Sequence, residues 1–274
     1  MSPYQAVFNL LLIIYSLSAA AYLFFFFTRN KRFALTGFYS AWSGLALHAA
    51  LIFYRSLVCG AFAVSSLYES LSFFAWVIVL VYLIFERKRR FWTDGTFVMP
   101  LVVSLMAYAS VMNSGIRPMP PALNSPWLVV HVALCFLSYA CFTLAFCFAL
   151  MYLWQEKELK SRKVDLFFFR LPPLGTLDRL GYKTVVLGFL FLTLGIVSGS
   201  VWAQNAWGAF WSWDPKETSS LVMWLLYLVY LHCRLILGWK GKKSAYLAAA
   251  GFAVMLFTYL GVSFLLPGVH SYLK

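Results

Sequence analysis

Charged residues are scarce in this sequence, and acidic residues are scarcer still. Only 11% of the 274 residues are charged, with 9 Asp and Glu against 22 Lys and Arg, while 62% are hydrophobic. A soluble globular domain carries about 25% charged residues, and a chain this apolar has too little polar surface to cover a water-exposed fold. These proportions exclude an ordinary soluble domain and indicate a protein whose solvent is the lipid bilayer.

The sequence also lacks paired cysteines and metal-binding cysteine spacings. None of its cysteines forms a CxxC pair, and four of the five lie in or beside apolar stretches, where Cys behaves as a small hydrophobic residue. They predict neither a disulfide framework nor a zinc site, and Cys59 is the only plausible reactive thiol. The five are Cys59, Cys135, Cys141, Cys147 and Cys233.

Eight apolar runs are long enough to cross the bilayer as helices. They cover residues 4–27, 33–54, 67–85, 96–113, 127–154, 184–203, 217–237 and 245–266. The sequence therefore predicts an all-α, polytopic membrane protein with about eight transmembrane helices and no internal repeat. We treat residues 1–274 as one membrane domain, with its N-terminal helices in 1–113 and its remaining helices in 127–274.

Two of the connections between these runs carry structural expectations of their own. The fifth helix is expected to continue into the charged stretch 155–163. The stretch 164–180 is expected to form an amphipathic helix that lies on the inner membrane surface. The connection 114–126 contains four prolines and should be extended.

The basic residues alternate between the connections. Eighteen of the 22 Lys and Arg follow the first, third, fifth and seventh runs, and the others are Arg55, Arg117, Lys216 and Lys274. Lys and Arg accumulate on the cytoplasmic side because they resist translocation. These four connections are therefore predicted to be cytoplasmic, and both chain termini extracytoplasmic. The net charge of +13 is a topology signal, and we expect no nucleic-acid partner.

A tryptophan-rich segment, residues 201–218, follows the sixth predicted helix on the outer side. It reads VWAQNAWGAFWSWDPKET, and its tryptophans are Trp202, Trp207, Trp211 and Trp213. An interfacial aromatic belt would explain some of them, but a belt is spread over many helix ends rather than gathered in one loop. A cluster of indoles suits a large, flat, apolar ligand. Porphyrin is the leading candidate, and sterols, quinones and lipid head groups remain open.

This segment closes with residues that predict a helix start. Asp214 precedes Pro215, which favours an extended backbone at Asp214 and a first helical turn at Pro215. Glu217 favours the positive end of that helix. We expect Asp214, Lys216 and Glu217 to hold the loop or to meet the charged edge of the ligand. Lys216 is the better partner for a carboxylate because of its charge.

Two of the four histidines are predicted to lie on the same side as the tryptophan-rich segment. His131 lies at the outer end of the fifth predicted helix, and His270 follows the eighth. Two imidazoles beside an aromatic platform match bis-histidine ligation of heme iron. We therefore predict that both are axial ligands.

The other two histidines lie inside predicted helices. His232 lies fifteen positions after Glu217, about 20–25 Å inward, so it cannot join the outer pair. An ionisable residue at this depth is costly and indicates a function. His48 lies nearer the outer side, with Arg55 two turns above it, and is more typical of a residue that hydrogen-bonds between helices.

Five motifs resemble the CcsA/ResC family of cytochrome c assembly proteins. The stretch 207–218 resembles their tryptophan-rich "WWD" signature, and its Asp-Pro-Lys-Glu ending resembles the CcsA/ResC branch of System II more than the CcmC or CcmF branches of System I. The resemblance extends in matching order from Tyr68 to Tyr272. The other motifs are Leu-Tyr-Glu-Ser-Leu at 67–71 with Trp76, Ser-Pro-Trp-Leu-Val-Val-His at 125–131, Tyr-Leu-His-x-Arg at 230–234 and Leu-Pro-Gly-Val-His-Ser-Tyr at 266–272.

The resemblance implies covalent attachment of heme b to the CxxCH segment of apocytochrome c on the extracytoplasmic side. His131 and His270 are then the outer iron ligands, and His232 is the ligand of an inner, transmembrane site. The heme platform comprises Trp202, Trp207, Gly208, Trp211, Trp213, Asp214, Lys216 and Glu217. Supporting residues are His48, Tyr68, Glu69, Arg55 and Trp127.

The same resemblance implies partners and a location. A CcsB/ResB-type membrane subunit would supply the second ligand of the inner site, so the chain would act as a holocytochrome c synthase only in complex with it. A thiol-reducing, thioredoxin-like protein of the outer compartment would keep the apocytochrome reduced. We expect an inner or plasma membrane, with the outer site facing the periplasm or the exterior, rather than a thylakoid membrane.

Two other functional classes remain open at this point. One is a heme exporter or chaperone without attachment activity, similar to the CcmC branch. The other is a regulator of heme metabolism similar to HemX-type membrane proteins, against which the complete Asp-Pro-Lys-Glu ending counts.

Overall fold

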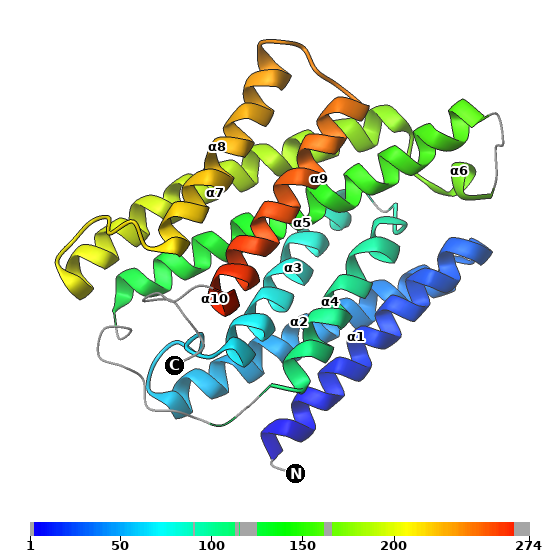
Figure 1. Cartoon of the computed structure of the whole chain (residues 1–274). Helices are drawn as coiled ribbons and strands as arrows, with labels where there is room; N and C mark the ends of the chain where they lie inside the picture. Colours follow the sequence, from blue (N-terminus) through cyan, green and yellow to red (C-terminus); the bar gives the residue numbers. More distant parts are fainter. Residues whose placement is uncertain (1–2, 90, 113–114, 116–124, 162–165, 266–274) are drawn as a thin grey trace. The chain divides into compact units, whose positions relative to one another are not determined.

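The computed structural model describes residues 3–89, 91–112, 115, 125–161 and 166–265. They form a succession of helices (Figure 1). No strand occurs among these residues, so the all-α prediction is confirmed. The chain divides into two compact units, Met1–Asn124 and Ser125–Lys274, which we call unit 1 and unit 2.

Unit 1 consists of long helices packed around buried tyrosines. α1 packs against α2 and α4, and α3 packs against α2 and α4. Glycines make room for the large rings, since a Cβ on Gly44 would lie 2.6 Å from Tyr15 and one on Gly95 would lie 2.6 Å from Tyr22. The helices are α1 (Pro3–Thr28), α2 (Lys31–Cys59), α3 (Leu67–Arg89) and α4 (Asp94–Ser110).

Unit 2 is built on two very long helices, α5 and α7, which run antiparallel along each other (Figure 1). α9 packs against α5, and α8 packs against α9. A π-helical turn, η2, interrupts the last helix, and such turns occur frequently at functional sites. The elements are α5 (Pro126–Ser161), α6 (Leu166–Arg170), α7 (Leu174–Trp207), α8 (Pro215–Leu235), α9 (Lys242–Leu256), η2 (Phe257–Gly261) and α10 (Val262–Leu265).

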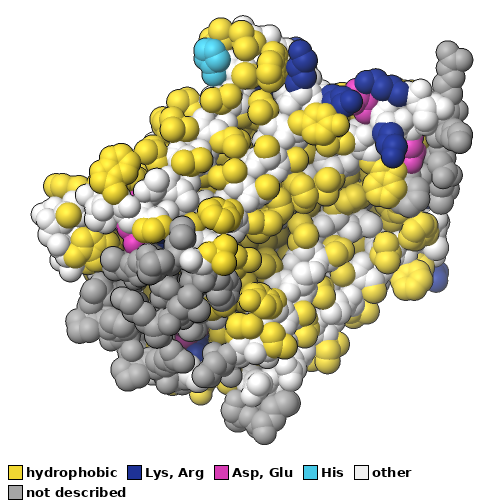
Figure 2. Space-filling model, in the orientation of Figure 1, with side chains coloured by type: hydrophobic (Ala, Val, Ile, Leu, Met, Phe, Trp, Pro, Cys, Tyr) yellow, Lys and Arg dark blue, Asp and Glu magenta, His cyan; other side chains and the backbone are white. Residues whose placement is uncertain are grey.

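The described helices have the length and composition of membrane spans. Seven are long and apolar enough to cross a bilayer, and α4, with 17 residues, is at the lower limit of spanning length. Hydrophobic side chains dominate the face drawn in Figure 2, and Lys and Arg gather where α9 begins. The chain is therefore a multi-pass helical membrane protein, as predicted.

α7 is longer at both ends than its apolar run predicts. It spans Leu174–Trp207 instead of 184–203. Its first turns alternate charged with apolar residues, so an apolar run cannot detect them. Leu177 and Leu180 are buried while Lys183 is exposed, which gives this part of α7 one packing face.

The prediction of a surface helix at 164–180 is wrong. The described part of that stretch holds only the five-residue α6 and then the start of α7. Pro173 occupies the N-cap position of α7, where its missing N–H breaks no helical hydrogen bond. The expected continuation of α5 into the charged stretch is confirmed, because the helix ends at Ser161.

Candidate functional site

The tryptophan-rich segment joins α7 to α8 at one end of unit 2, which we call the outer end after the charge asymmetry. α7 ends at Trp207, and Gly208 follows in the left-handed conformation with φ 77°. Its N–H donates to the Gln204 carbonyl at 3.0 Å. Glycine adopts this backbone without steric cost. Gly208 therefore ends α7 and turns the chain into the segment.

Asp214 and Glu217 fix the start of α8. The Asp214 carboxylate accepts the Lys216 N–H at 2.8 Å, and Glu217 reaches back to accept the Asp214 N–H at 3.3 Å, which makes a capping box. Glu217 also accepts the backbone N–H and the hydroxyl of Ser212, at 2.7 and 3.1 Å. The predicted helix start is confirmed, and both carboxylates hold the loop.

The four tryptophans form two edge-to-face pairs rather than one exposed platform. The ring centroids of Trp202 and Trp207 are 4.9 Å apart, and those of Trp211 and Trp213 are 5.9 Å apart. Trp202 is only 3% exposed, whereas Trp213 is 69% exposed. Because α7 continues to Trp207, Trp202 lies inside the helix against α5, which corrects its expected place in the outer loop.

His131 of α5 lies against Trp202 of α7. The two rings are stacked, with centroids 6.0 Å apart and an interplanar angle of 20°. His131 Nδ1 is 2.8 Å from the carbonyl oxygen of Gly195. A carbonyl oxygen can only accept, so Nδ1 carries the proton and the lone pair is on Nε2, as in a metal-ligating histidine. Cys135 Sγ, one turn further along α5, lies 3.7 Å from Nδ1.

An open, apolar groove lies beside Trp213 at the outer end of unit 2. Its volume is about 710 Å³, which is within the range of small-molecule sites. Its walls include Val222 of α8, Val254 of α9, Phe257 of η2 and Val262 of α10. The exposed indole of Trp213 therefore borders a surface suited to a flat apolar ligand.

His232 lies at the opposite, inner end of unit 2. It is an exposed residue near the end of α8 and follows Pro215 by 17 positions, about 25 Å. Two residues later, Arg234 forms a bidentate ion pair with Asp178 of α7, at 2.7 and 2.6 Å. The Asp178 carboxylate also accepts the Gly241 N–H at 2.7 Å. The inner end of α8 is thus tied to α7 and to the start of α9.

His48 of unit 1 is fully buried, and both of its ring nitrogens are within hydrogen-bond distance of neighbours. Nδ1 is 3.2 Å from the Tyr15 hydroxyl of α1, and Nε2 is 2.8 Å from the Ser72 hydroxyl of α3. His48 therefore links three helices, as its hydrogen-bonding interpretation predicts.

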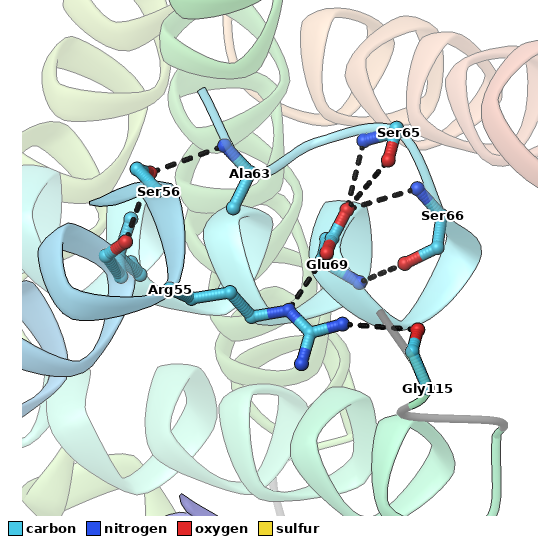
Figure 3. A network of polar contacts seen from close by, with 8 residues as sticks. Arg55, Ser56, Ala63, Ser65, Ser66, Glu69 and Gly115 are labelled. Atoms are coloured by element: carbon cyan, nitrogen blue, oxygen red, sulfur yellow. Dashed lines mark hydrogen bonds and ion pairs between the residues drawn. The ribbon is translucent and has the colours of Figure 1, made fainter. Parts of the chain in front are cut away.

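Arg55 and Glu69 form a buried polar network in unit 1 (Figure 3). Arg55 Nε donates to Glu69 at 2.7 Å, and its Nη2 donates to the Gly115 carbonyl at 3.3 Å. The second oxygen of Glu69 accepts the backbone N–H groups of Ser65 and Ser66, at 2.9 and 3.1 Å. These contacts tie α2, α3 and two connections together.

Tyr68 and Trp127 are the remaining supporting candidates. Tyr68 is buried, and its ring centroid lies 5.3 Å from the Arg55 guanidinium carbon, so it belongs to the same network. Trp127 is 46% exposed in the first turn of α5. Of these two residues, only Trp127 has an exposed side chain.

His270 and its motif lie outside the described residues, so the second outer ligand remains a prediction. Within the part of the chain that the structure describes, no group of three or more His, Cys, Asp and Glu side chains could hold a metal ion. A porphyrin needs only axial ligands from a protein because its own four nitrogens hold the iron.

Three contact residues at the two ends were missed by the sequence reasoning. Gly195 and Gly199 lie against His131 and Cys135. The repetition of glycine along one helix is the sequence pattern that could have indicated this close contact. Asp178 is the only acidic residue of α7, which could have identified it as a partner for a nearby basic residue.

Comparison with known proteins reveals clear similarity over most of the chain. The sequence model of the family described as "Cytochrome C assembly protein" matches residues 64–270. The "Cytochrome c biogenesis protein CcsA" of Heterosigma akashiwo is 38% identical over 246 residues, covering 77% of this chain and 76% of the relative. The protein of the same name from Microcystis aeruginosa is 38% identical over 272 residues, covering 82% and 83%.

The fold is also similar to that of a solved structure. The "Cytochrome c Heme Lyase CcmF" superposes with a TM-score of 0.68 at 18% sequence identity, covering 95% of this chain. This chain corresponds to 47% of that protein's length. The likeness concerns the helical fold alone.

Proposed function

This chain belongs to the cytochrome c assembly protein family, and we propose that it delivers heme to apocytochrome c and attaches it covalently on the extracytoplasmic side. One observation carries the proposal. The Nδ1–H of His131 donates to the Gly195 carbonyl beside the tryptophan-rich segment, so the Nε2 lone pair is the one that can bind iron.

At the outer site, the porphyrin lies against the indoles of Trp207, Trp211 and Trp213, with His131 and His270 as axial ligands. Flat apolar rings stack favourably on indoles, and the apolar groove beside Trp213 accepts the edge of the macrocycle. Lys216 is half-buried at the start of α8 and meets a propionate. Asp214 and Glu217 act by holding the loop, as their hydrogen bonds indicate. Trp202 packs against the His131 ring and does not contact the porphyrin.

Attachment joins the two thiols of the CxxCH segment to the two vinyl groups of heme b. Each sulfur bonds to one vinyl carbon, and the thiol proton ends on the neighbouring carbon, so the step involves no net oxidation. The histidine of the CxxCH segment replaces one axial imidazole. The chain contributes orientation and control of the iron ligands rather than acid–base chemistry.

The inner site uses His232 and a second ligand from a CcsB/ResB-type partner subunit. The exposure of His232 at the end of α8 supports this assignment, because another chain can reach it. A thioredoxin-like protein supplies reduced apocytochrome thiols in the outer compartment. We place the complex in an inner or plasma membrane. Fractionation of the native cells tests this location.

The proposal is tested with the chain and its partner purified together, heme b and reduced apocytochrome c. His131→Ala and His270→Ala should each abolish the bis-histidine absorption spectrum and lower covalent cytochrome formation by more than about tenfold. Mutation of a residue that only hydrogen-bonds to a metal ligand already lowers metal affinity or activity by about that factor. Added imidazole should restore activity. His48→Gln is the matched control, since His48 bonds to Tyr15 and Ser72 and should leave the heme spectrum unchanged.

Two outcomes would overturn the proposal. Unchanged axial ligation in both variants would remove the ligand assignment. Heme transferred to apocytochrome without thioether bonds by the unaltered complex would identify an exporter or chaperone instead.

A further inference from the structure

The outer half of α7 reaches α5 through glycines at the positions opposite His131. A Cβ on Gly199 would lie 2.5 Å from His131 Nδ1, and one on Gly195 would lie 2.9 Å from Cys135 Sγ. Non-bonded carbon atoms prefer about 3.5–4.0 Å. A side chain at Gly199 therefore could not coexist with the present position of the imidazole.

The same short stretch of α7 contacts His131 in two further ways. The Gly195 carbonyl accepts the Nδ1–H at 2.8 Å. Trp202 lies almost parallel to the imidazole, with ring centroids 6.0 Å apart. α7 thus supplies an open backbone, a hydrogen-bond acceptor and an aromatic wall, spaced over about two helical turns.

We propose that Gly195, Gly199 and Trp202 form a seat for His131 that sets which of its nitrogens faces the iron. They are positioning residues, because they act through His131. This inference rests on the proposed role of His131 as an outer heme ligand. The inference predicts that substitutions on α7 change how His131 of α5 binds the iron. Among the described residues, α7 itself supplies no proposed heme ligand.

The physical basis is the second contact of a metal-ligating histidine. The nitrogen that does not bind the metal usually donates to a carboxylate or carbonyl, which fixes the tautomer and the ring orientation. Loss of such a contact typically lowers metal affinity or activity about 10- to 100-fold. Here the acceptor is a backbone carbonyl, so it is lost only by moving the helices apart or rotating the ring.

Gly199→Ala tests the seat most directly, in the chain purified with its partner. The added methyl group should displace the imidazole, lower outer heme retention about 10- to 100-fold and weaken the bis-histidine spectrum. Added imidazole should restore the spectrum. Restoration distinguishes a misplaced ligand from an unfolded protein.

Two glycines of the same helix provide matched controls. A Cβ on Gly188 would lie 2.5 Å from Phe142 of α5, an equally severe clash that is remote from His131, whereas one on Gly181 would approach Phe148 only to 3.9 Å. Gly188→Ala should lower thermal stability and leave the spectrum of the retained heme unchanged. Gly181→Ala should change neither property.

A second variant keeps the inference testable if Gly199→Ala does not fold. Trp202→Leu removes the aromatic wall without adding atoms to the interface, and it should weaken outer ligation several-fold, again with restoration by imidazole. Wild-type ligation in a folded Gly199→Ala protein, or in Trp202→Leu, would overturn the seat. If these variants bind heme normally while His131→Ala abolishes ligation, only this inference fails. If His131→Ala also has no effect on ligation, the proposed function itself fails.

Discussion

The two ends of unit 2 hold a histidine in opposite ways. At the outer end, His131 is stacked on Trp202 and bonded to the Gly195 carbonyl, so its ring orientation is set within this chain. At the inner end, His232 is exposed, and the nearby contacts belong to Arg234 and Asp178 instead. Under the proposed function, the outer ligand is oriented by its own chain, whereas the inner ligand is left open for a partner chain to complete.

The two ends also differ in what holds the backbone. The outer connection is fixed by short-range hydrogen bonds of Asp214 and Glu217 within a few residues of each other. The inner end depends on a long-range ion pair between Arg234 of α8 and Asp178 of α7. Loss of the inner contact should therefore separate helices, whereas loss of the outer contact should loosen one loop.

Asp178→Asn should have the larger effect, because it leaves Arg234 without its ionised partner. Breaking a buried ion pair costs about 3–5 kcal/mol, and these side chains are 10% and 15% exposed. We therefore expect the free energy of unfolding to fall by about 2–3 kcal/mol, with weaker heme binding at the inner site and an unchanged outer spectrum. Thermal unfolding and heme spectra of the detergent-solubilised complex provide the measurement.

Glu156→Gln is the control for that variant, because it breaks an ion pair between neighbouring turns of α5 whose Lys160 side chain is 65% exposed. Exposed pairs contribute little, so its unfolding temperature should match that of the unaltered protein. An Asp178→Asn protein that is no less stable than this control would show that the inner end does not depend on the ion pair.

Asp214→Ala should have the smaller effect, confined to the outer connection. Removing an N-cap side chain costs about 1 kcal/mol, and Asp214→Asn should retain most of the cap. Amide hydrogen exchange across residues 208–214 should accelerate in the Ala variant only. Equal exchange in the two variants would mean that the capping box does not hold the segment.

Much of this architecture follows from local patterns in the sequence. Apolar runs identify the helices because the bilayer requires about 20 apolar residues per span, and the Asp214–Pro215 pair predicts the start of α8. His48 is a further example, since a buried histidine inside an apolar helix needs hydrogen-bond partners.

The remaining features depend on which helix faces meet. The burial of Trp202 follows from the extension of α7 to Trp207 and from its register against α5, and neither is encoded in the local pattern. The pairings of Gly199 with His131 and of Asp178 with Arg234 join residues 68 and 56 positions apart in the sequence. Such contacts are set by tertiary packing rather than by periodicity.

The contrast between the two histidines is tested most directly by the heme that this chain retains without its partner. Absorption spectra of His131→Ala and His232→Ala should be compared for the chain alone and for the complex. We predict that His131→Ala removes the heme held by the chain alone, and that His232→Ala changes only the complex. Heme retained by the chain alone through His232, with no loss in His131→Ala, would contradict the assignment of a prepared outer ligand and an incomplete inner one.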